Sequence, residues 1–142
     1  MAKEGNGRTW CVTGDGAHQS TLNDISVMGR YNAKPIIFVL NNGIYGVEDV
    51  LSMRGHEYDD LASVNYHMLP KALGCTDWLS TKVNTVEELD TVFDKLRNHD
   101  GAAYIEVSWT TIGLTCTIRA HFAHYKGHDP ERGEPTLFKG RH

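Results

Sequence analysis

The stretch Ile36-Ile37-Phe38-Val39-Leu40-Asn41-Asn42-Gly43 decides the fold. An unbroken apolar run that ends at a turn signal is expected for a strand buried on both faces of a parallel sheet. Upstream, residues 8–13 are β-prone and end at Gly14-Asp15-Gly16, which predicts another strand running into a tight turn. The two strands and the segment between them predict a β-α-β unit.

The segment between the two strands carries apolar side chains at three-residue steps, which predicts a helix over residues 20–31. Ser20 or Thr21 is expected to cap its start, and Lys34-Pro35 to end it. The apolar residues of this face are Leu22, Ile25, Met28 and Tyr31.

Downstream of the turn, the pattern of strands and helices continues. Residues 61–73 predict a weaker helix that is interrupted by Pro70 and stops at Gly74, and residues 76–81 predict a short strand. Residues 85–88 form a capping box that opens a further helix, and residues 102–107 predict the last strand. The expected apolar face of the capped helix consists of Val86, Leu89, Val92, Phe93 and Leu96.

This order of elements predicts an α/β fold, with a mainly parallel sheet and helices on both faces. Ligands in such folds bind at the carboxyl ends of the strands. We expect one domain over residues 1–108. Residues 109–142, which contain several glycines and prolines, are expected to form a C-terminal tail or an oligomer contact.

The composition narrows the class of protein. Of the 142 residues, 40% are hydrophobic and 23% are charged, as in ordinary globular domains, and the formal net charge is −4. A chain without a basic surplus is not expected to bind nucleic acid by neutralising phosphates. The sequence shows neither a membrane span nor a signal peptide's apolar segment, so we expect a cytoplasmic protein. The three cysteines are widely separated and are expected to be buried or semi-buried thiols.

The polar residues at the two strand ends suit a metal and a phosphate group. Asp15 offers a carboxylate, Asn42 a side-chain carbonyl, and the loop at Gly43-Ile44 a backbone carbonyl, all hard oxygen ligands of the kind that Mg²⁺ prefers. Gly14 and Gly16 are expected to let the backbone turn sharply and approach a ligand. Either turn alone also occurs in loops without function, so the pairing of the two carries the prediction.

The paired turns resemble the Gly-Asp-Gly to Asn-Asn signature of the thiamin-diphosphate enzymes. The similarity runs through Gly14-Asp15-Gly16-Ala17-His18-Gln19-Ser20-Thr21 and Val39-Leu40-Asn41-Asn42 to Tyr45-Gly46-Val47-Glu48. It covers roughly residues 8 to 107 and is greatest to the pyruvate and indolepyruvate decarboxylases, which act on 2-oxo acids. The resemblance implies a thiamin-diphosphate-binding fold and, specifically, the C-terminal pyrophosphate domain of such an enzyme.

The resemblance also implies roles for individual residues. Asp15, Asn42 and the main-chain carbonyl of Ile44 would hold Mg²⁺. Residues 14–17 would line the thiamin-diphosphate site, with Gly16 and Ala17 at the diphosphate. Val47 would border the substrate space.

Glu48 falls where the family carries an active-site carboxylate that handles protons during decarboxylation and product release. The alternative for Glu48 is a solvated residue in the first turn of a helix. His18 is unusual for its position, and we interpret it as a solvent-facing histidine near the cofactor. Ile44 stands where the family often has glycine, although Gly43 just before it would supply the flexibility of the turn.

Complete enzymes of this family are several times longer than this chain. Their cofactor lies between the pyrophosphate domain and a pyrimidine domain, whose glutamate activates the aminopyrimidine ring and which we do not find here. Catalysis is therefore expected to need a partner that carries the pyrimidine domain. For its assembly we expect either a homo-oligomer or a complex with such a partner chain. The alternatives are a non-catalytic remnant that self-associates on the same scaffold, and a general nucleotide or phosphate binder.

The tail holds a further histidine pattern. His121, His124 and His128 could place imidazoles around a metal, but Gly127 and Pro130 disfavour the continuous helix that this would need. A polar surface tail or a subunit contact is the preferred interpretation.

Overall fold

The structure is a computed structural model that describes residues 8–51 and 57–108. The tail, with His121, His124 and His128, therefore lies outside the described residues. The described chain divides into a larger unit, residues 8–43 with 62–108, and a smaller unit formed from residues 44–51 and 57–61. The two units are described separately below.

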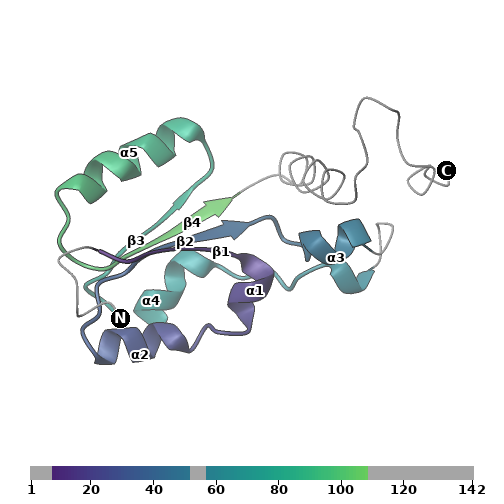
Figure 1. Cartoon of the computed structure of the whole chain (residues 1–142), viewed down its shortest axis with the longest axis horizontal. Coiled ribbons are helices and arrows are strands. Elements are labelled where there is room, and N and C mark those ends of the chain that lie inside the picture. The colour runs from purple at the N-terminus through teal and green to yellow at the C-terminus, as the bar shows by residue number, and fades with distance from the viewer. Residues whose placement is uncertain (1–7, 52–56, 109–142) are drawn as a thin grey trace, which may run out of the picture. The chain divides into compact units, whose positions relative to one another are not determined.

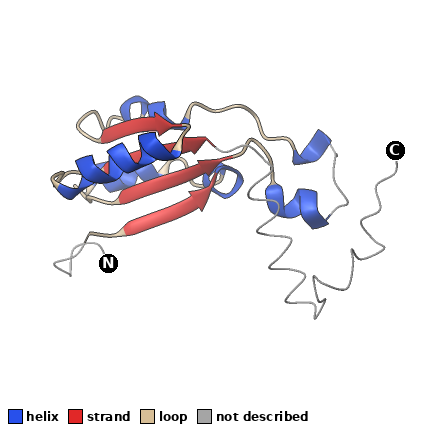
Figure 2. Ribbon diagram, turned by 90° about the horizontal axis from the view of Figure 1, so that it is seen from above, coloured by secondary structure: helices blue, strands red, loops and turns tan. Residues whose placement is uncertain are grey.

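The larger unit is built on a four-stranded sheet in the order β1-β2-β4-β3, in which every pair of neighbours is parallel. Figure 2 shows the strand arrows pointing the same way. This confirms the predicted α/β fold. The strands are β1 Trp10–Gly14, β2 Ile36–Asn41, β3 Leu79–Val83 and β4 Ala103–Ser108.

Helices cover both faces of this sheet (Figure 1). One face carries the short helices of the first half of the unit together with η2 and α4, and the opposite face carries α5 alone among the described helices. The helices of the larger unit are α1 Asp15–Gln19, α2 Asp24–Arg30, η2 Tyr66–Met68, α4 Leu69–Ala72 and α5 Val86–Arg97. The smaller unit contains α3 Gly46–Leu51 and η1 Glu57–Asp59.

The apolar run that predicted β2 is buried on both faces of the sheet. Ile37 and Val39 belong to the cluster beneath α2 and α4, whereas Ile36 and Phe38 pack with α5. Alternate side chains of a strand point to opposite faces, so both must be apolar when both are covered. This is the physical reason that the run contains no polar residue before Asn41.

The predicted helix over residues 20–31 was wrong at its start. Helix α1 begins directly after β1, and the amides of Ser20 and Thr21 donate to carbonyls of α1, at 3.3 Å to Ala17 and 2.9 Å to His18. These residues therefore close α1 instead of capping the next helix. Helix α2 starts only at Asp24 and lacks a side-chain cap.

The apolar face of that segment was predicted correctly at three positions of four. Ile25 is buried, and Leu22 and Met28 pack against the same cluster, but Tyr31 is 60% exposed. Tyr31 lies one residue past the end of α2, so the helical spacing no longer directs its side chain to the sheet.

The capping box predicted for α5 is present. The Thr85 side chain accepts a hydrogen bond from the Glu88 amide at 3.2 Å, and the Glu88 carboxylate accepts one from the Asn84 amide at 2.6 Å. Val92 and Leu96 are buried on the expected face, whereas Val86 is exposed at the first position of the helix. The strand predicted at 76–81 begins later, at Leu79, because the chain turns before it.

In the described part of the chain, no helix combines the length and the apolar character that crossing a membrane would require.

Candidate functional site

Asp15 lies at the carboxyl end of β1, where the strand passes into α1. Its side chain is buried, and its two oxygens accept hydrogen bonds from the amides of Gly16, at 3.0 Å, and Gly43, at 2.7 Å. The second bond joins the turn after β1 to the turn after β2. The structure thus brings together the two motifs that the sequence placed at neighbouring strand ends.

The turn after β2 depends on Gly43. Its φ of +75° lies in the left-handed region, which residues with a side chain rarely adopt. This conformation directs the Gly43 amide to Asp15, and the half-buried Asn42 stands directly before it. Gly43 therefore supplies the turn, as the sequence predicted.

Gly14 has a different role from the one expected. Its φ of −79° and ψ of 154° are ordinary extended values, so the turn does not require glycine there. A Cβ built on Gly14 would meet no atom within 4 Å. The missing side chain thus leaves open space at the end of β1. Ala17, two residues into α1, is exposed.

Ile44, Val47 and Glu48 belong to the smaller unit. Ile44 pairs with Asp60 in an antiparallel bridge, and the Tyr45 amide donates to the Asp59 carbonyl at 2.8 Å. Val47 and Glu48 lie in the first turn of α3 and are exposed within this unit. Their participation in a site with Asp15 stays a prediction.

The interpretation of His18 as a solvent-facing histidine was wrong. His18 is buried, and its Nε2 lies 2.7 Å from the hydroxyl of Tyr104 on β4. Burial lowers the pKa of His18, an effect that the charge of Asp24 partly opposes. Burial also raises the pKa of Tyr104, so its hydroxyl keeps its proton, and the tautomer of His18 decides which of the two groups donates the hydrogen bond. His18 anchors α1 to the sheet.

Tyr66 also forms hydrogen bonds with α1. The hydroxyl of Tyr66, a buried residue of η2, donates to the Asp15 carbonyl at 3.4 Å and accepts from the Gln19 side chain at 2.9 Å. Both ends of α1 are thereby connected to η2. The turn that carries Asp15 is held by tertiary hydrogen bonds as well as by its own sequence.

Glu106 is a residue that sequence reasoning missed. It lies on β4, is fully buried, and accepts hydrogen bonds from Asn41, from Lys82 and from both the amide and the ring of His67. Burial raises the pKa of Glu106, but these four donors outweigh it and leave the pKa below its usual value. The available signal was a carboxylate standing alone in the apolar run 102–107.

The described residues include no cluster of three or more metal-binding histidine, cysteine or acidic side chains. A metal at this edge would therefore depend on the Asp15 carboxylate together with amide and backbone oxygens and ligand phosphates. Among the cysteines, Cys75 is buried, as expected, but Cys11 is exposed on β1. Cys116 lies outside the described residues.

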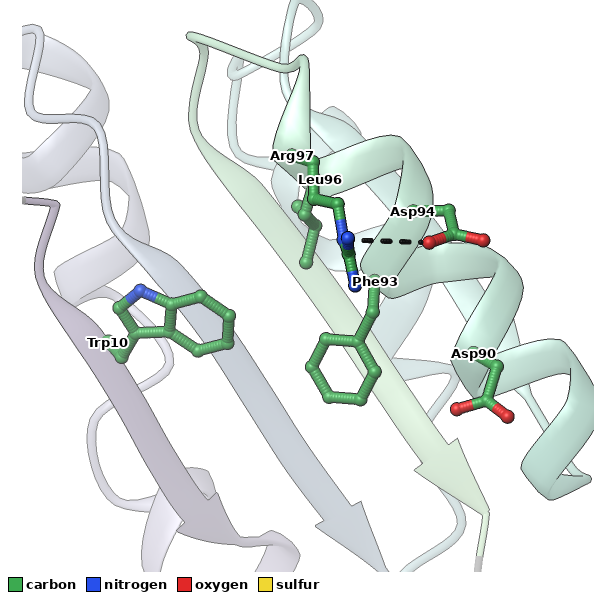
Figure 3. Close-up of a pocket in the computed structure, with 6 residues that line it drawn as sticks. All are labelled: Trp10, Asp90, Phe93, Asp94, Leu96 and Arg97. Carbon is green, nitrogen blue, oxygen red and sulfur yellow. Dashed lines mark ion pairs between the residues drawn. The ribbon is translucent and has the colours of Figure 1, made fainter.

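A pocket lies away from this edge, between the start of β1 and α5 (Figure 3). The Trp10 ring stacks on Phe93 with centroids 6.3 Å apart, and Arg97 pairs with Asp94 at 3.5 Å. Trp10 opens β1, whereas Asp15 follows its end. The pocket is therefore separate from the candidate site.

Comparisons with known proteins give the family. The model of the thiamine pyrophosphate enzyme C-terminal TPP binding domain matches residues 1–107. An alpha-keto-acid decarboxylase of Mycobacterium avium (strain 104) is 34% identical over 101 residues, which are 70% of this chain and 18% of that protein. A pyruvate decarboxylase of Aspergillus fumigatus is 36% identical over 93 residues, 65% of this chain and 16% of that protein.

The solved structure of the Rhodococcus jostii RHA1 thiamine diphosphate-dependent 4-hydroxybenzoylformate decarboxylase has a similar fold. The TM-score is 0.64 at 23% identity, over 74% of this chain and 20% of that one. This likeness supports the fold alone. The chain spans less than a fifth of the length of the two decarboxylases above, which are 16% and 18% covered. It belongs to the thiamine pyrophosphate enzyme family, as a C-terminal cofactor-binding domain similar to those of the 2-oxo-acid decarboxylases.

Proposed function

We propose that this chain binds thiamin diphosphate through Mg²⁺ at the ends of β1 and β2, as the diphosphate half of a 2-oxo-acid decarboxylase. The observation that carries the proposal is the 2.7 Å hydrogen bond from the Gly43 amide to the Asp15 carboxylate. It shows that the two halves of the family motif meet in the folded chain.

The residues present fit such a group chemically. An ionised carboxylate has about four acceptor positions on its two oxygens, and the two backbone amides at Asp15 use only part of them. Asn42 adds an amide oxygen next in sequence to Gly43. Mg²⁺ usually takes only one or two protein carboxylates and completes its shell with phosphates and water. The open space at Gly14 would admit a ligand close to the backbone.

In this proposal, Asp15, Asn42 and the Ile44 carbonyl hold the metal. Gly16 and Ala17 contact the diphosphate, and Val47 borders the substrate. When bound, the cofactor would supply the electron sink that decarboxylation of a 2-oxo acid requires. Glu48 would move a proton at the reacting carbon.

Catalysis in this proposal also needs a pyrimidine-binding domain, contributed by a longer protein or by a partner chain. The support is the length of the relatives, of which this chain covers 18% or less. A 2-oxo acid would then bind between the two domains.

Isothermal titration of the full chain with thiamin diphosphate and Mg²⁺ tests the site. Asp15→Asn should weaken binding by at least roughly 10–100-fold, because the loss of a group that merely orients a metal ligand typically has an effect of that size. Asp90→Asn, an exposed change on α5, is the matched control and should leave binding unchanged. Binding that needs no Mg²⁺, or that is indifferent to Asp15→Asn in a folded protein, would contradict the proposal.

Self-association is a second candidate, favoured by the surface of β1. Trp10 is 53% and Val12 64% exposed on this strand, which forms one edge of the described sheet. Exposed apolar edge strands tend to pair with other chains. Light scattering at rising concentration should show dimers or larger species that Val12→Lys abolishes. A monomer at all concentrations would exclude this candidate.

A further inference from the structure

Glu106 stands at the centre of the sheet, where an ionised group is costly unless it is fully paired. Its register partners are Val39 on β2 and Lys82 on β3. Its carboxylate reaches one neighbour strand through Asn41, the other through Lys82, and η2 through His67. Three segments of the larger unit, β2, β3 and η2, thus converge on one side chain of β4.

The hydrogen bonds of this carboxylate are complete. Oε1 accepts from Asn41 Nδ2 at 2.8 Å and lies 3.2 Å from Lys82 Nζ, while Oε2 accepts from the His67 amide at 3.0 Å and lies 2.6 Å from its ring Nδ1. Each oxygen therefore has two donors, which is its full capacity. A carboxylate saturated in this way has no position left for a ligand, so its role must act through the groups it holds.

One of these groups leads directly to the candidate metal site. Asn41 is the last residue of β2 and immediately precedes Asn42 and Gly43. By fixing the Asn41 side chain, Glu106 restrains the point at which the chain leaves the sheet and enters the turn. That turn delivers the Gly43 amide to Asp15.

We propose that Glu106 is a positioning residue for the metal and diphosphate site, acting through Asn41 on the Asn42-Gly43 turn. The proposal rests on the proposed function for its effect on cofactor affinity. Its structural part, the restraint of the turn, does not require the cofactor. Groups that orient metal ligands from outside typically change metal affinity by roughly 10–100-fold when they are removed.

The competing explanation is that Glu106 merely cross-links the sheet to η2. Two single variants separate the explanations, because each removes one donor from the same oxygen. Asn41→Ala breaks the connection to the turn, whereas Lys82→Met breaks the connection to β3 and leaves the turn intact. If Glu106 positions the site, Asn41→Ala and Glu106→Gln weaken Mg²⁺–thiamin diphosphate binding by about tenfold or more, and Lys82→Met changes it less than threefold.

The double variant Glu106→Gln with Asn41→Ala provides the sharper test. Residues that act through one another are non-additive, so the double variant should lose little more affinity than the weaker-binding single variant. Glu106→Gln combined with Lys82→Met should bind as Glu106→Gln does. Thermal melts of every variant establish that the protein is folded. Additive losses in the first pair, or equal losses for Asn41→Ala and Lys82→Met, would overturn the proposal.

A measurement without cofactor keeps the two proposals distinct. In the ¹⁵N-labelled full chain, Glu106→Gln and Asn41→Ala should speed amide hydrogen exchange at Gly43 by about tenfold relative to the core amide of Val39, and Lys82→Met should not. Unchanged exchange at Gly43 in both variants would refute the positioning role. A wild-type chain that shows this pattern but fails to bind thiamin diphosphate would refute only the proposed function.

Discussion

The carboxylate of Asp15 and the amide of Gly43, 28 residues apart, are joined by a hydrogen bond of 2.7 Å. This bond ties the end of β1 to the end of β2. Because Asp15 is buried and also accepts the Gly16 amide, the acidic side chain has a structural role besides the one proposed toward Mg²⁺.

Asp15→Asn should therefore destabilise the chain even without cofactor. An asparagine presents one oxygen and one NH₂ group, so one of the two backbone amides would face a donor. Leaving a buried amide unsatisfied costs about 1–3 kcal/mol, which urea unfolding can resolve. Asp90→Asn, on the exposed face of α5, should stay within about 0.5 kcal/mol of wild type. Equal stabilities of the two variants would show that the Asp15 bonds contribute nothing.

The sequence was sufficient to predict the meeting of these two turns. The apolar run at residues 36–40 identifies a central strand, and parallel strands place Asp15 and Asn42 at one edge. These inferences depend on local patterns and on a topology rule. Boundaries were less certain, as at α1, where the Asp15 carboxylate in the first turn accepts one hydrogen bond from the adjacent Gly16 amide and one from the distant Gly43 amide.

The buried polar contacts were beyond sequence reasoning for a physical reason. His18 meets Tyr104 across 86 positions, and Glu106 meets Asn41 across 65. A histidine after a glycine-rich turn looks solvent-facing, and only the placement of β4 beneath α1 shows that it is buried. Residue type alone does not reveal whether a polar group has a partner.

Tyr104→Phe should lower the free energy of unfolding by about 1–3 kcal/mol, the cost of leaving a buried partner without its hydrogen bond. The variant keeps the ring, and therefore the packing, but removes the hydroxyl that lies 2.7 Å from His18 Nε2. Tyr31→Phe, on a tyrosine that is 60% exposed just past the end of α2, is the matched control and should change stability little. A neutral Tyr104→Phe would mean that His18 finds another partner.

The stability of the chain should fall as the pH drops below 6.5, the ordinary pKa of histidine. Because burial lowers the pKa of His18, the unfolded chain binds a proton there more readily than the folded chain. Protonation therefore favours unfolding from pH 6.5 down to the folded pKa. Urea unfolding between about pH 7 and 5 covers this range, in which the other histidines also titrate but most carboxylates do not. His18→Gln should flatten the profile in this range, and an unchanged slope would assign it to other groups.

Thr85→Ala should destabilise the chain by about 1 kcal/mol, the usual cost of losing a helix cap. The Thr85 hydroxyl accepts the Glu88 amide at 3.2 Å, and that amide has no partner within the helix. Thr91→Ala is the control, because the exposed Thr91 hydroxyl only donates to the Glu87 carbonyl inside α5. Thermal unfolding should rank Thr85→Ala below Thr91→Ala. The opposite order would show that α5 is stabilised by its buried face alone.

Gly29→Ala reverses the usual effect of this substitution in a helix. Alanine favours a helix interior by about 0.5–1 kcal/mol over glycine, but a Cβ at Gly29 would collide with the Cys75 Sγ atom. Cys75 is buried, and its thiol donates to the Ile25 carbonyl at 3.6 Å, so it cannot move without loss. Overpacking of this kind costs about 1–3 kcal/mol, and Gly29→Ala should therefore destabilise the chain. In a Cys75→Ala background the colliding sulfur is absent, and the same change should become neutral or stabilising. Chemical unfolding of the four proteins measures this reversal, and a loss that persists without the sulfur would place the strain elsewhere.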